Sequence, residues 1–239
     1  MVRVWIGCLC LVSLLGCGEQ VSSRDDARIL LLGDSMFAAN TATNQGVADI
    51  IEAALGQEVI DRSVPGARYF YALPISGAAG LNLAAQFRPA DWDVVIVNGG
   101  GNDLLFGCGC GKCDRVLDRL ISPDGRQGAI PAFVAKLSAT GARVVYAGYL
   151  RNPGTSTVIK SCGPAGNELD RRLAALDKLE PALTFVPMSD LVPHGDLTYH
   201  QIDRIHPSRK GSREIGLRIV RVAAPMLSAA QQPTKAPEG

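Results

Sequence analysis

The sequence has few aromatic residues and no excess of charge of either sign. Phe, Trp and Tyr make up 5% of its 239 residues, which argues against a broad aromatic surface for stacking bases or sugars. Its 24 Lys and Arg residues balance 23 Asp and Glu residues, and no block of basic residues stands out. Nucleic-acid-binding domains carry a concentrated positive charge, so we expect no nucleic-acid partner.

The chain also has no internal repeat and no second domain boundary. Hydrophobic residues make up 47% of it, enough for one packed core. Apolar runs typical of strands alternate with stretches of helical periodicity. The expected strands are 28–32, 58–64, 92–98, 143–149 and 184–188, and the expected helices are 43–55, 81–87, a stretch from about 115, 128–140, 167–178 and 210–227. This alternation predicts an α/β fold with a five-stranded parallel sheet covered by helices on both faces.

The N-terminus has the pattern of a targeting segment. Arg3 is followed by an apolar run over 4–15 that is too short to span a bilayer as a mature helix. The run ends in Leu-Leu-Gly-Cys at 14–17, which resembles the lipobox of bacterial lipoproteins. This resemblance implies cleavage before Cys17 and a diacylglycerol on its sulfur. The alternative is an ordinary secretory signal that is cleaved nearby.

We therefore expect residues 1–16 to be a signal peptide and residues 17–27 to be a polar tether. The domain is expected at 28–228, followed by a polar tail at 229–239 that we expect to be disordered. Gly18, rather than an aspartate, follows the cysteine, and by analogy with bacterial lipoproteins this carries no inner-membrane retention signal. The expected location is the periplasmic face of a membrane, as an outer-membrane lipoprotein, with the membrane as a partner through the lipid anchor.

Four cysteines fall within the expected domain, at positions 108, 110, 113 and 162. Export to an oxidising compartment favours two disulfides. A direct Cys108–Cys110 bridge would close a very small ring, so the expected pairing joins Cys162 to Cys108 or to Cys110. We expect this link to hold the loop that bears Asn102. The alternatives are a four-cysteine zinc site and a redox pair of Cys110 and Cys113.

One apolar run ends abruptly in a Gly-Asp-Ser triplet. Residues 28–32 have strand character, Gly33-Asp34-Ser35 follows, and a helical pattern comes next. A serine there lies at the carboxyl end of a buried strand, where open α/β sheets place their ligands. It also lies at a helix N-terminus, whose free N–H groups favour developing negative charge. We interpret Ser35 as a nucleophile; the alternative is an ordinary helix cap.

Three further motifs lie after predicted strands or before the last helix. They are Ser-Val-Pro-Gly at 63–66, Gly-Gly-Asn-Asp at 100–103 and Asp-Arg-Ile-His-Pro at 203–207. Acyl transfer needs a nucleophile, a base, a group that orients the base, and donors for the oxyanion. His206 is the candidate base, and Asp203 can meet it across a tight turn. The candidate oxyanion donors are the backbone N–H groups of Ser35 and Gly66 and the side-chain amide of Asn102.

The four motifs, in this order, resemble the SGNH hydrolase family, also called GDSL-type esterases and lipases. The resemblance runs from about Arg28 to the last helix, with Met36 where the family often has leucine. It implies a flavodoxin-like three-layer α/β/α sandwich. It also implies the same assignment of nucleophile, triad and oxyanion donors to the residues named above.

The expected function is that of a serine hydrolase that cleaves small acyl esters or thioesters through an acyl-enzyme, with no metal and no cofactor. The expected substrate is a small-molecule ester or an acylated glycan, and the oligomeric state stays open. One alternative is a carbohydrate or peptidoglycan O-acetylesterase or acetyltransferase with the same residues. The other is a non-catalytic surface lipoprotein that uses the fold for binding.

The three histidines suggest one more alternative, a metal cluster of His194, His200 and His206 with Asp196 and Asp203. The histidine spacings of six match no recognised ligand pattern. Among the three, only His206 has an aspartate three residues before it. We therefore expect His194 and His200 to be loop or pocket-rim residues.

Overall fold

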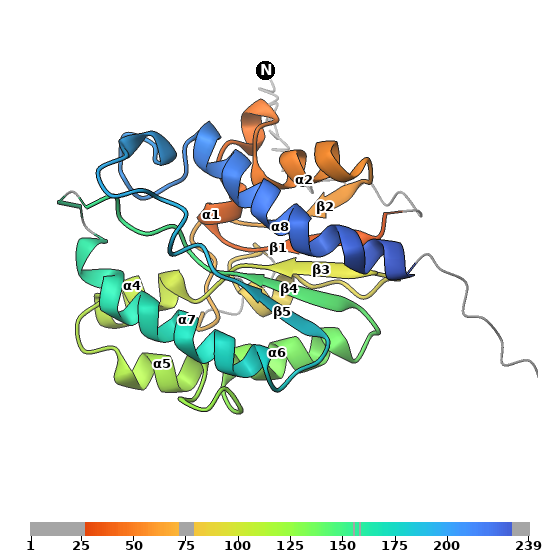
Figure 1. Ribbon diagram of the computed structural model, residues 1–239. Helices are drawn as coiled ribbons and strands as arrows, with labels where there is room; N and C mark the ends of the chain where they lie inside the picture. The colour runs from red at the N-terminus through yellow and green to blue at the C-terminus, as the bar shows by residue number, and fades with distance from the viewer. Residues whose placement is uncertain (1–26, 72–78, 155, 158, 231–239) are drawn as a thin grey trace, which may run out of the picture.

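The computed structural model describes residues 27–71, 79–154, 156–157 and 159–230. Within them lies a sheet of five parallel strands in the order β2-β1-β3-β4-β5 (Figure 1). The strands are β1 (Ile29–Leu32), β2 (Val59–Asp61), β3 (Val94–Val97), β4 (Arg143–Ala147) and β5 (Leu183–Val186). The prediction of an α/β fold with a five-stranded parallel sheet is confirmed.

The two central strands are buried on both faces. No residue of β1 or β3 is accessible to solvent, and all of them are Ile, Leu or Val, as suits a strand covered on both sides. Successive side chains of a strand point to opposite faces. Accordingly, Ile29 and Leu31 pack in one hydrophobic cluster, whereas Leu30 and Leu32 pack in a second one.

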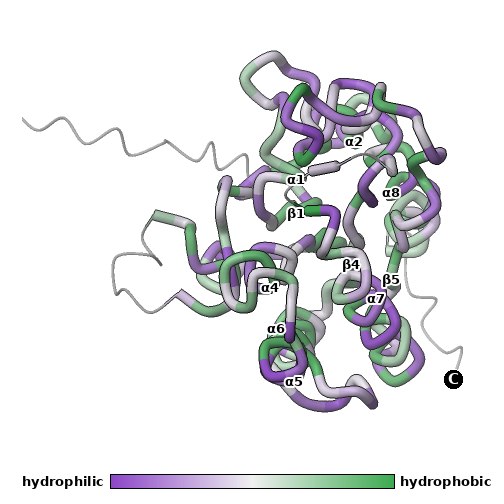
Figure 2. Tube along the Cα trace, turned by 90° about the vertical axis from the view of Figure 1, so that its left-hand side faces the viewer, coloured by the Kyte–Doolittle hydropathy of each residue, from purple (hydrophilic) through white to green (hydrophobic). Residues whose placement is uncertain are grey.

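Helices cover both faces of the sheet. In the described chain they are α1 (Ser35–Ala38), α2 (Val47–Leu55), α4 (Gly101–Cys108), α5 (Asp114–Leu120), α6 (Ala129–Ser138), α7 (Gly163–Asp177) and α8 (Arg209–Ala230). Figure 2 shows α2 and α8 together on one side of β1 and β4, with α5, α6 and α7 on the other. The molecule is therefore a three-layer α/β/α sandwich, as the family resemblance implies.

The strand order leaves a crevice at one edge of the sheet. β1 pairs with β2 on one side and with β3 on the other, so that Ile29 lies opposite both Val59 and Val94. The order 2-1-3-4-5 is that of flavodoxin-like folds, in which the segments that leave the first and third strands diverge. Ser35 follows β1 and Asn102 follows β3, so both residues border this crevice.

Two predicted helices are corrected in length or type. The predicted helix 81–87 is a 3₁₀ turn, η2 (Leu83–Gln86), because the Asn82 side chain accepts from the N–H of Ala85 and because Pro89 disfavours helical backbone just before it. The predicted helix 43–55 starts only at Val47, after a separate 3₁₀ turn, η1 (Thr41–Thr43).

Two further helices extend beyond their predicted ends. α7 begins four residues before the predicted 167, because a proline is tolerated in the first turn of a helix, where its missing N–H has no partner in any case. α8 runs to Ala230, so the first two residues of the predicted tail 229–239 are helical. The remainder of that tail, the predicted signal peptide 1–16 and Cys17 lie outside the described residues.

Membrane-spanning helices are absent from the part of the chain that the structure describes, where no helix combines the length and the apolar character needed for a crossing.

Candidate active site

Ser35 is held at the end of β1 by a cap and by a buried amide. It is the first residue of α1, whose N-cap Asp34 accepts a hydrogen bond from the backbone N–H of Met36 at 2.9 Å. Gly33, which precedes Asp34, donates its backbone N–H to the side-chain oxygen of the buried Gln86, and its C=O accepts from the Gln86 side-chain amide. These contacts fix the turn from strand to helix and leave the Ser35 side chain facing the crevice.

Asp203 and His206 form a tight pair on the segment before α8. The ring Nδ1 of His206 lies 2.5 Å from Asp203 Oδ2. Asp203 Oδ1 accepts from the backbone N–H groups of Ile205 and His206, which closes the turn. Between them Arg204 has a φ of 59°, in the left-handed region that side chains other than glycine rarely adopt. Such local strain is typical of functional segments held by their surroundings.

The electrostatics of the pair favour a charged aspartate. Partial burial acts to raise the pKa of Asp203, but the hydrogen bonds from the His206 ring and from the backbone of Ile205 and His206 outweigh it and hold that pKa below its usual value. An ionised carboxylate accepts the proton on Nδ1. The other nitrogen of the ring, Nε2, is then left unprotonated and able to act as a base.

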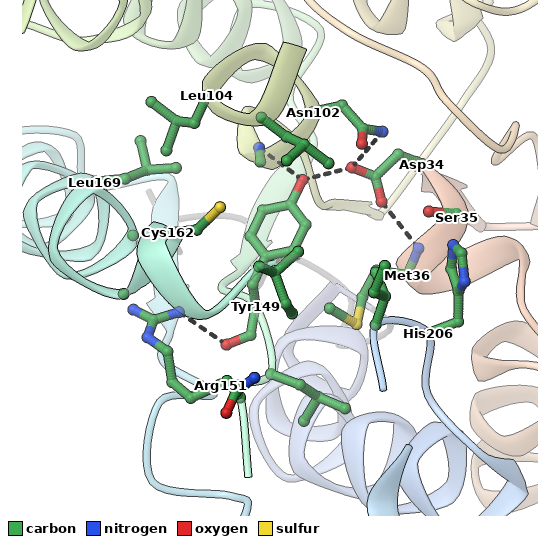
Figure 3. Close-up of a pocket in the computed structure, with 18 of the residues that line it drawn as sticks. Asp34, Ser35, Met36, Asn102, Leu104, Tyr149, Arg151, Cys162, Leu169 and His206 are labelled. Carbon is green, nitrogen blue, oxygen red and sulfur yellow. Dashed lines mark hydrogen bonds between the residues drawn. The ribbon is translucent and has the colours of Figure 1, made fainter. Parts of the chain in front are cut away.

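Ser35 and His206 line the same cavity and lie next to each other in it (Figure 3). They come from opposite ends of the chain, since one follows β1 and the other precedes α8. Among the described residues, the Ser35 hydroxyl has no hydrogen-bond partner. It is therefore free to turn toward the ring of His206 when a substrate enters.

The predicted oxyanion donors are brought together in part. Val64 to Ala67 form a turn closed by a 3.0 Å hydrogen bond from Ala67 N–H to Val64 C=O, and Gly66 takes the left-handed conformation that a type II turn requires after proline. Asn102 lines the cavity and donates its side-chain amide to the C=O of Ala67 at 3.1 Å. Gly66 itself does not line the cavity, but this bond ties its turn to Asn102.

Asp34, Tyr149 and the start of α4 form a buried network beside Ser35. The Tyr149 hydroxyl donates to Asp34 Oδ2 at 2.5 Å and accepts from the backbone N–H of Gly101 at 3.0 Å. The Asn102 amide reaches the same carboxylate oxygen at 3.4 Å. A Cβ at Gly101 would lie 2.6 Å from the Tyr149 ring, so glycine is needed for this close approach.

Burial changes the proton affinity of this network. Desolvation raises the pKa of Asp34 to about 6, although the hydrogen bonds from Tyr149 and Met36 oppose the rise. Desolvation also holds the pKa of Tyr149 well above its usual value, with the neighbouring Asp34 charge acting in the same direction. At neutral pH the tyrosine is therefore a proton donor and Asp34 is its ionised acceptor.

The cavity itself has a volume of about 120 Å³ and extends from Ser35 between α4 and α7. Its lining beyond the polar residues is mostly apolar: Met36, Leu104, Leu105, Leu150, Ile159, Cys162, Leu169 and Ile205. A mostly apolar space beside Ser35 suits an uncharged part of a substrate.

Two disulfides lie at the α4–α7 end of the site. Cys110 is joined to Cys162, which is one of the two pairings expected from the sequence, and Cys108 is joined to Cys113. Of these four residues, only Cys162 lines the cavity. The first bridge links the residues just after α4 to the start of α7, and so it joins the helix that bears Asn102 to the opposite wall.

The other two histidines take no part in this constellation. His200 is buried, its two ring nitrogens have no hydrogen-bond partner within the described residues, and desolvation lowers its pKa. His194 is exposed in a loop against Gly154. Within the described residues no three His, Cys, Asp or Glu side chains gather as metal ligands would.

Sequence reasoning missed three side chains that shape the site. From the sequence, Tyr149 is only the end of a predicted strand and Gln86 part of a predicted helix, and Asp103 is part of the Gly-Gly-Asn-Asp motif with no role assigned. Asp103 accepts from the backbone N–H groups of Tyr69 and Phe70 and so anchors the segment that follows Gly66. The available signal for Tyr149 was a residue with a polar hydroxyl two positions after a buried strand, whereas nothing local marks Gln86.

Among the comparisons with known proteins, a family model gives the family and solved structures give the fold. Residues 31–214 match the model of the GDSL-like Lipase/Acylhydrolase family. A structure described as an SGNH hydrolase from Slackia heliotrinireducens is 20% identical, covers 83% of this chain and 99% of its own, and gives a TM-score of 0.57. An acylhydrolase from Bacteroides fragilis is 19% identical, with 85% and 89% covered and a TM-score of 0.60.

A third structure, a carbohydrate esterase family 2 enzyme with a carbohydrate-binding domain from Corynascus thermopiles, is 16% identical, with 84% of this chain and 67% of that chain covered and a TM-score of 0.56. At these identities the structural likenesses establish the fold. No curated protein matches the sequence.

Proposed function

Because this chain belongs to the GDSL-like lipase/acylhydrolase family and is therefore an ester hydrolase, we propose that it cleaves acyl esters or thioesters through an acyl-enzyme on Ser35. The observation that carries the proposal is the meeting of Ser35, the His206–Asp203 pair and Asn102 at one cavity. These are the groups that acyl transfer requires, and they come from three separate segments of the chain.

In the proposed first step, Ser35 Oγ attacks the carbonyl carbon of the ester and gives its proton to Nε2 of His206. The tetrahedral intermediate collapses, the bond to the alcohol or thiol breaks, and the leaving group takes that proton from His206. In the second step, His206 takes a proton from water, the hydroxide attacks the acyl-enzyme, and the proton returns to Ser35 as the carboxylic acid leaves.

The proposed oxyanion donors are the backbone N–H of Ser35, the N–H of Gly66 and the amide of Asn102. The first of these belongs to the opening turn of α1, where N–H groups have no partner inside the helix. Asn102 has one proton on Ala67 and a longer contact, 3.4 Å, to Asp34. The longer contact is the one that a developing oxyanion would replace.

The test is hydrolysis of p-nitrophenyl acetate by the wild type and by Ser35→Ala. We expect Ser35→Ala to lose at least about a thousandfold in kcat, because removal of a triad member leaves only the oxyanion hole and binding. Ser161→Ala is the matched control, since Ser161 is exposed and does not line the cavity. Undiminished turnover by Ser35→Ala would refute the assignment.

Covalent labelling separates this function from a binding role. A small dialkyl fluorophosphate should modify the wild type on Ser35 and leave Ser35→Ala unmodified. A folded wild type that is neither labelled nor active on any ester would instead be a non-catalytic binding protein.

We also propose that the domain is exported and held at the periplasmic face of a membrane by a diacylglycerol on Cys17. The support is the order of residues at the N-terminus, where a positive charge, a short apolar run and Leu-Leu-Gly-Cys follow one another. The two disulfides fit an oxidising compartment.

A further inference from the structure

Different residues line the two ends of the cavity. Ser35 and His206 lie at one end in Figure 3, Leu169 and Cys162 lie at the other, and Tyr149 is between them. In acyl transfer the leaving group must be next to the base that protonates it. The alcohol part of the ester therefore belongs near His206, and the acyl part extends toward α7.

The wall of the cavity that α7 forms contains two glycines that the helical backbone does not require. Gly163 and Gly166 both line the cavity, one turn apart, between Cys162 and Leu169. A Cβ added at Gly166 would meet its nearest atom, in the Arg151 guanidinium, at 3.5 Å, which is ordinary contact. Neither glycine has a positive φ. Alanine would favour the helix at such positions, so what glycine contributes there is space.

The same end of the cavity is apolar and electrically neutral. Leu104, Leu105 and Leu169 line it, and no ionised carboxylate is among its lining residues there. Arg151 also lines it, but each of its three nitrogens donates to a protein partner: Asn167, the C=O of Tyr149 and Asp170. With its charge matched by Asp170, the arginine leaves no unpaired charge for an anionic tail.

From these walls we infer that the space between α4 and α7 is the site for an uncharged apolar acyl chain longer than acetyl, and that Gly166 is the residue that sets how long a chain is admitted. The inference rests on the proposed esterase function of Ser35. It predicts that the enzyme prefers esters with acyl chains of medium length to acetyl esters. The Cys110–Cys162 bridge fixes the distance between the two walls.

The first experiment compares kcat/KM of the full chain for p-nitrophenyl acetate, butyrate, hexanoate and octanoate. We expect at least a tenfold rise from acetate to hexanoate, because each methylene buried in an apolar pocket adds to transition-state binding. A preference for acetate over all longer chains, or for an acetylated glycan over hexanoate, would overturn the inference.

The second experiment fills the space. Gly166→Leu should lower the hexanoate-to-acetate ratio of kcat/KM at least tenfold, and Gly166→Ala should lower it by a smaller factor. Pro164→Leu is the matched control, because Pro164 is exposed on the same helix and does not line the cavity. It should keep the wild-type ratio. A ratio unchanged in both Gly166 variants would overturn the assignment.

Labelling with the small fluorophosphate keeps the result interpretable. A variant that is labelled at the wild-type rate has an intact nucleophile, so its altered ratio reports on chain length and not on unfolding. If Gly166→Leu is not labelled, the Gly166→Ala ratio decides. If acetate turnover depends on Ser35 but the hexanoate-to-acetate ratio is the same in the Gly166 variants as in the wild type, only this inference is refuted. If no turnover depends on Ser35, the proposed function itself is refuted.

Discussion

Asp34 lies beside Ser35 with 1% of its surface exposed. It has three uses at once: it caps α1 through Met36, accepts from Tyr149 and faces the amide of Asn102. An ionised Asp34 can serve all three donors, whereas a protonated one loses acceptor capacity. The charge on Asp34 therefore couples the turn that holds Ser35 to Asn102 at the start of α4.

Tyr149→Phe should lower kcat more than it raises KM and should move the acid limb of the kcat/KM profile to higher pH. The hydrogen bond from Tyr149 lowers the pKa of Asp34, so its loss lets burial raise that pKa above about 6. As the pH falls, Asp34 of the variant therefore becomes protonated at a higher pH than Asp34 of the wild type. Asp103 and His206 also face this carboxylate, the first raising and the second lowering its pKa.

Tyr146→Phe is the control for that profile. Its hydroxyl is buried in the same region but bonds to Tyr69 and to the C=O of Gly99, with no contact to Asp34. Both variants should lose stability, and only Tyr149→Phe should shift the acid limb. Superimposable profiles for Tyr149→Phe and the wild type would show that Asp34 has no part in the activity.

At the scale of elements, the two disulfides differ in what they close. Cys110–Cys162 spans 52 positions and joins the segment just after α4 to the N-cap of α7, whereas Cys108–Cys113 spans five and joins the end of α4 to the N-cap of α5. In the chain-entropy account a longer closed loop restricts the unfolded chain more. The long bridge should therefore matter more for stability, in addition to its place at the cavity.

Replacement of both cysteines of the long bridge by serine should cost about 4 kcal/mol of unfolding free energy, and the same replacement in the short bridge about 2 kcal/mol. Denaturant unfolding of the two double variants measures this difference, with each variant serving as the control for the other. Equal losses, or a larger loss for the short bridge, would contradict the entropic argument.

The elements also show where sequence reasoning succeeds and fails. The sequence predicts β1 and β3 correctly, because an unbroken apolar run bounded by polar residues has few alternatives to a buried parallel strand. The sequence predicts a helix where the structure has the 3₁₀ turn at Leu83–Gln86, because the apolar spacing is the same and only Asn82 and Pro89 distinguish the two. The sequence predicts the start of α7 four residues too late, because Gly163, Pro164 and Gly166 are typical of a loop.

At the scale of the whole molecule, the residues predicted to form the site converge because parallel strands end at one edge. That rule alone brings Ser35 and Asn102 together, and the Asp-x-x-His spacing supplies the pair on the segment before α8. Tyr149 and Gln86 were missed because their partners, Asp34 and Gly33, are 115 and 53 positions away. Contacts of that range are fixed by packing and leave no local pattern.

The proposed membrane anchor is also tested on the whole molecule. Cys17→Ala should abolish incorporation of labelled fatty acid and release the enzyme from the membrane fraction, because a diacylglycerol on the cysteine is the proposed attachment. The esterase activity of the released protein should equal that of the wild type, since the catalytic domain begins later in the chain. Membrane association that survives in Cys17→Ala would argue for a different mode of attachment.

The separation of Ser35 and His206 along the chain has a consequence for biosynthesis. A ribosome adds the proposed base only some 170 residues after the proposed nucleophile. Every nascent chain therefore carries a serine without its imidazole until α8 is being made. A chain that terminates before position 206 lacks the proposed base, and we expect it to be inactive towards esters.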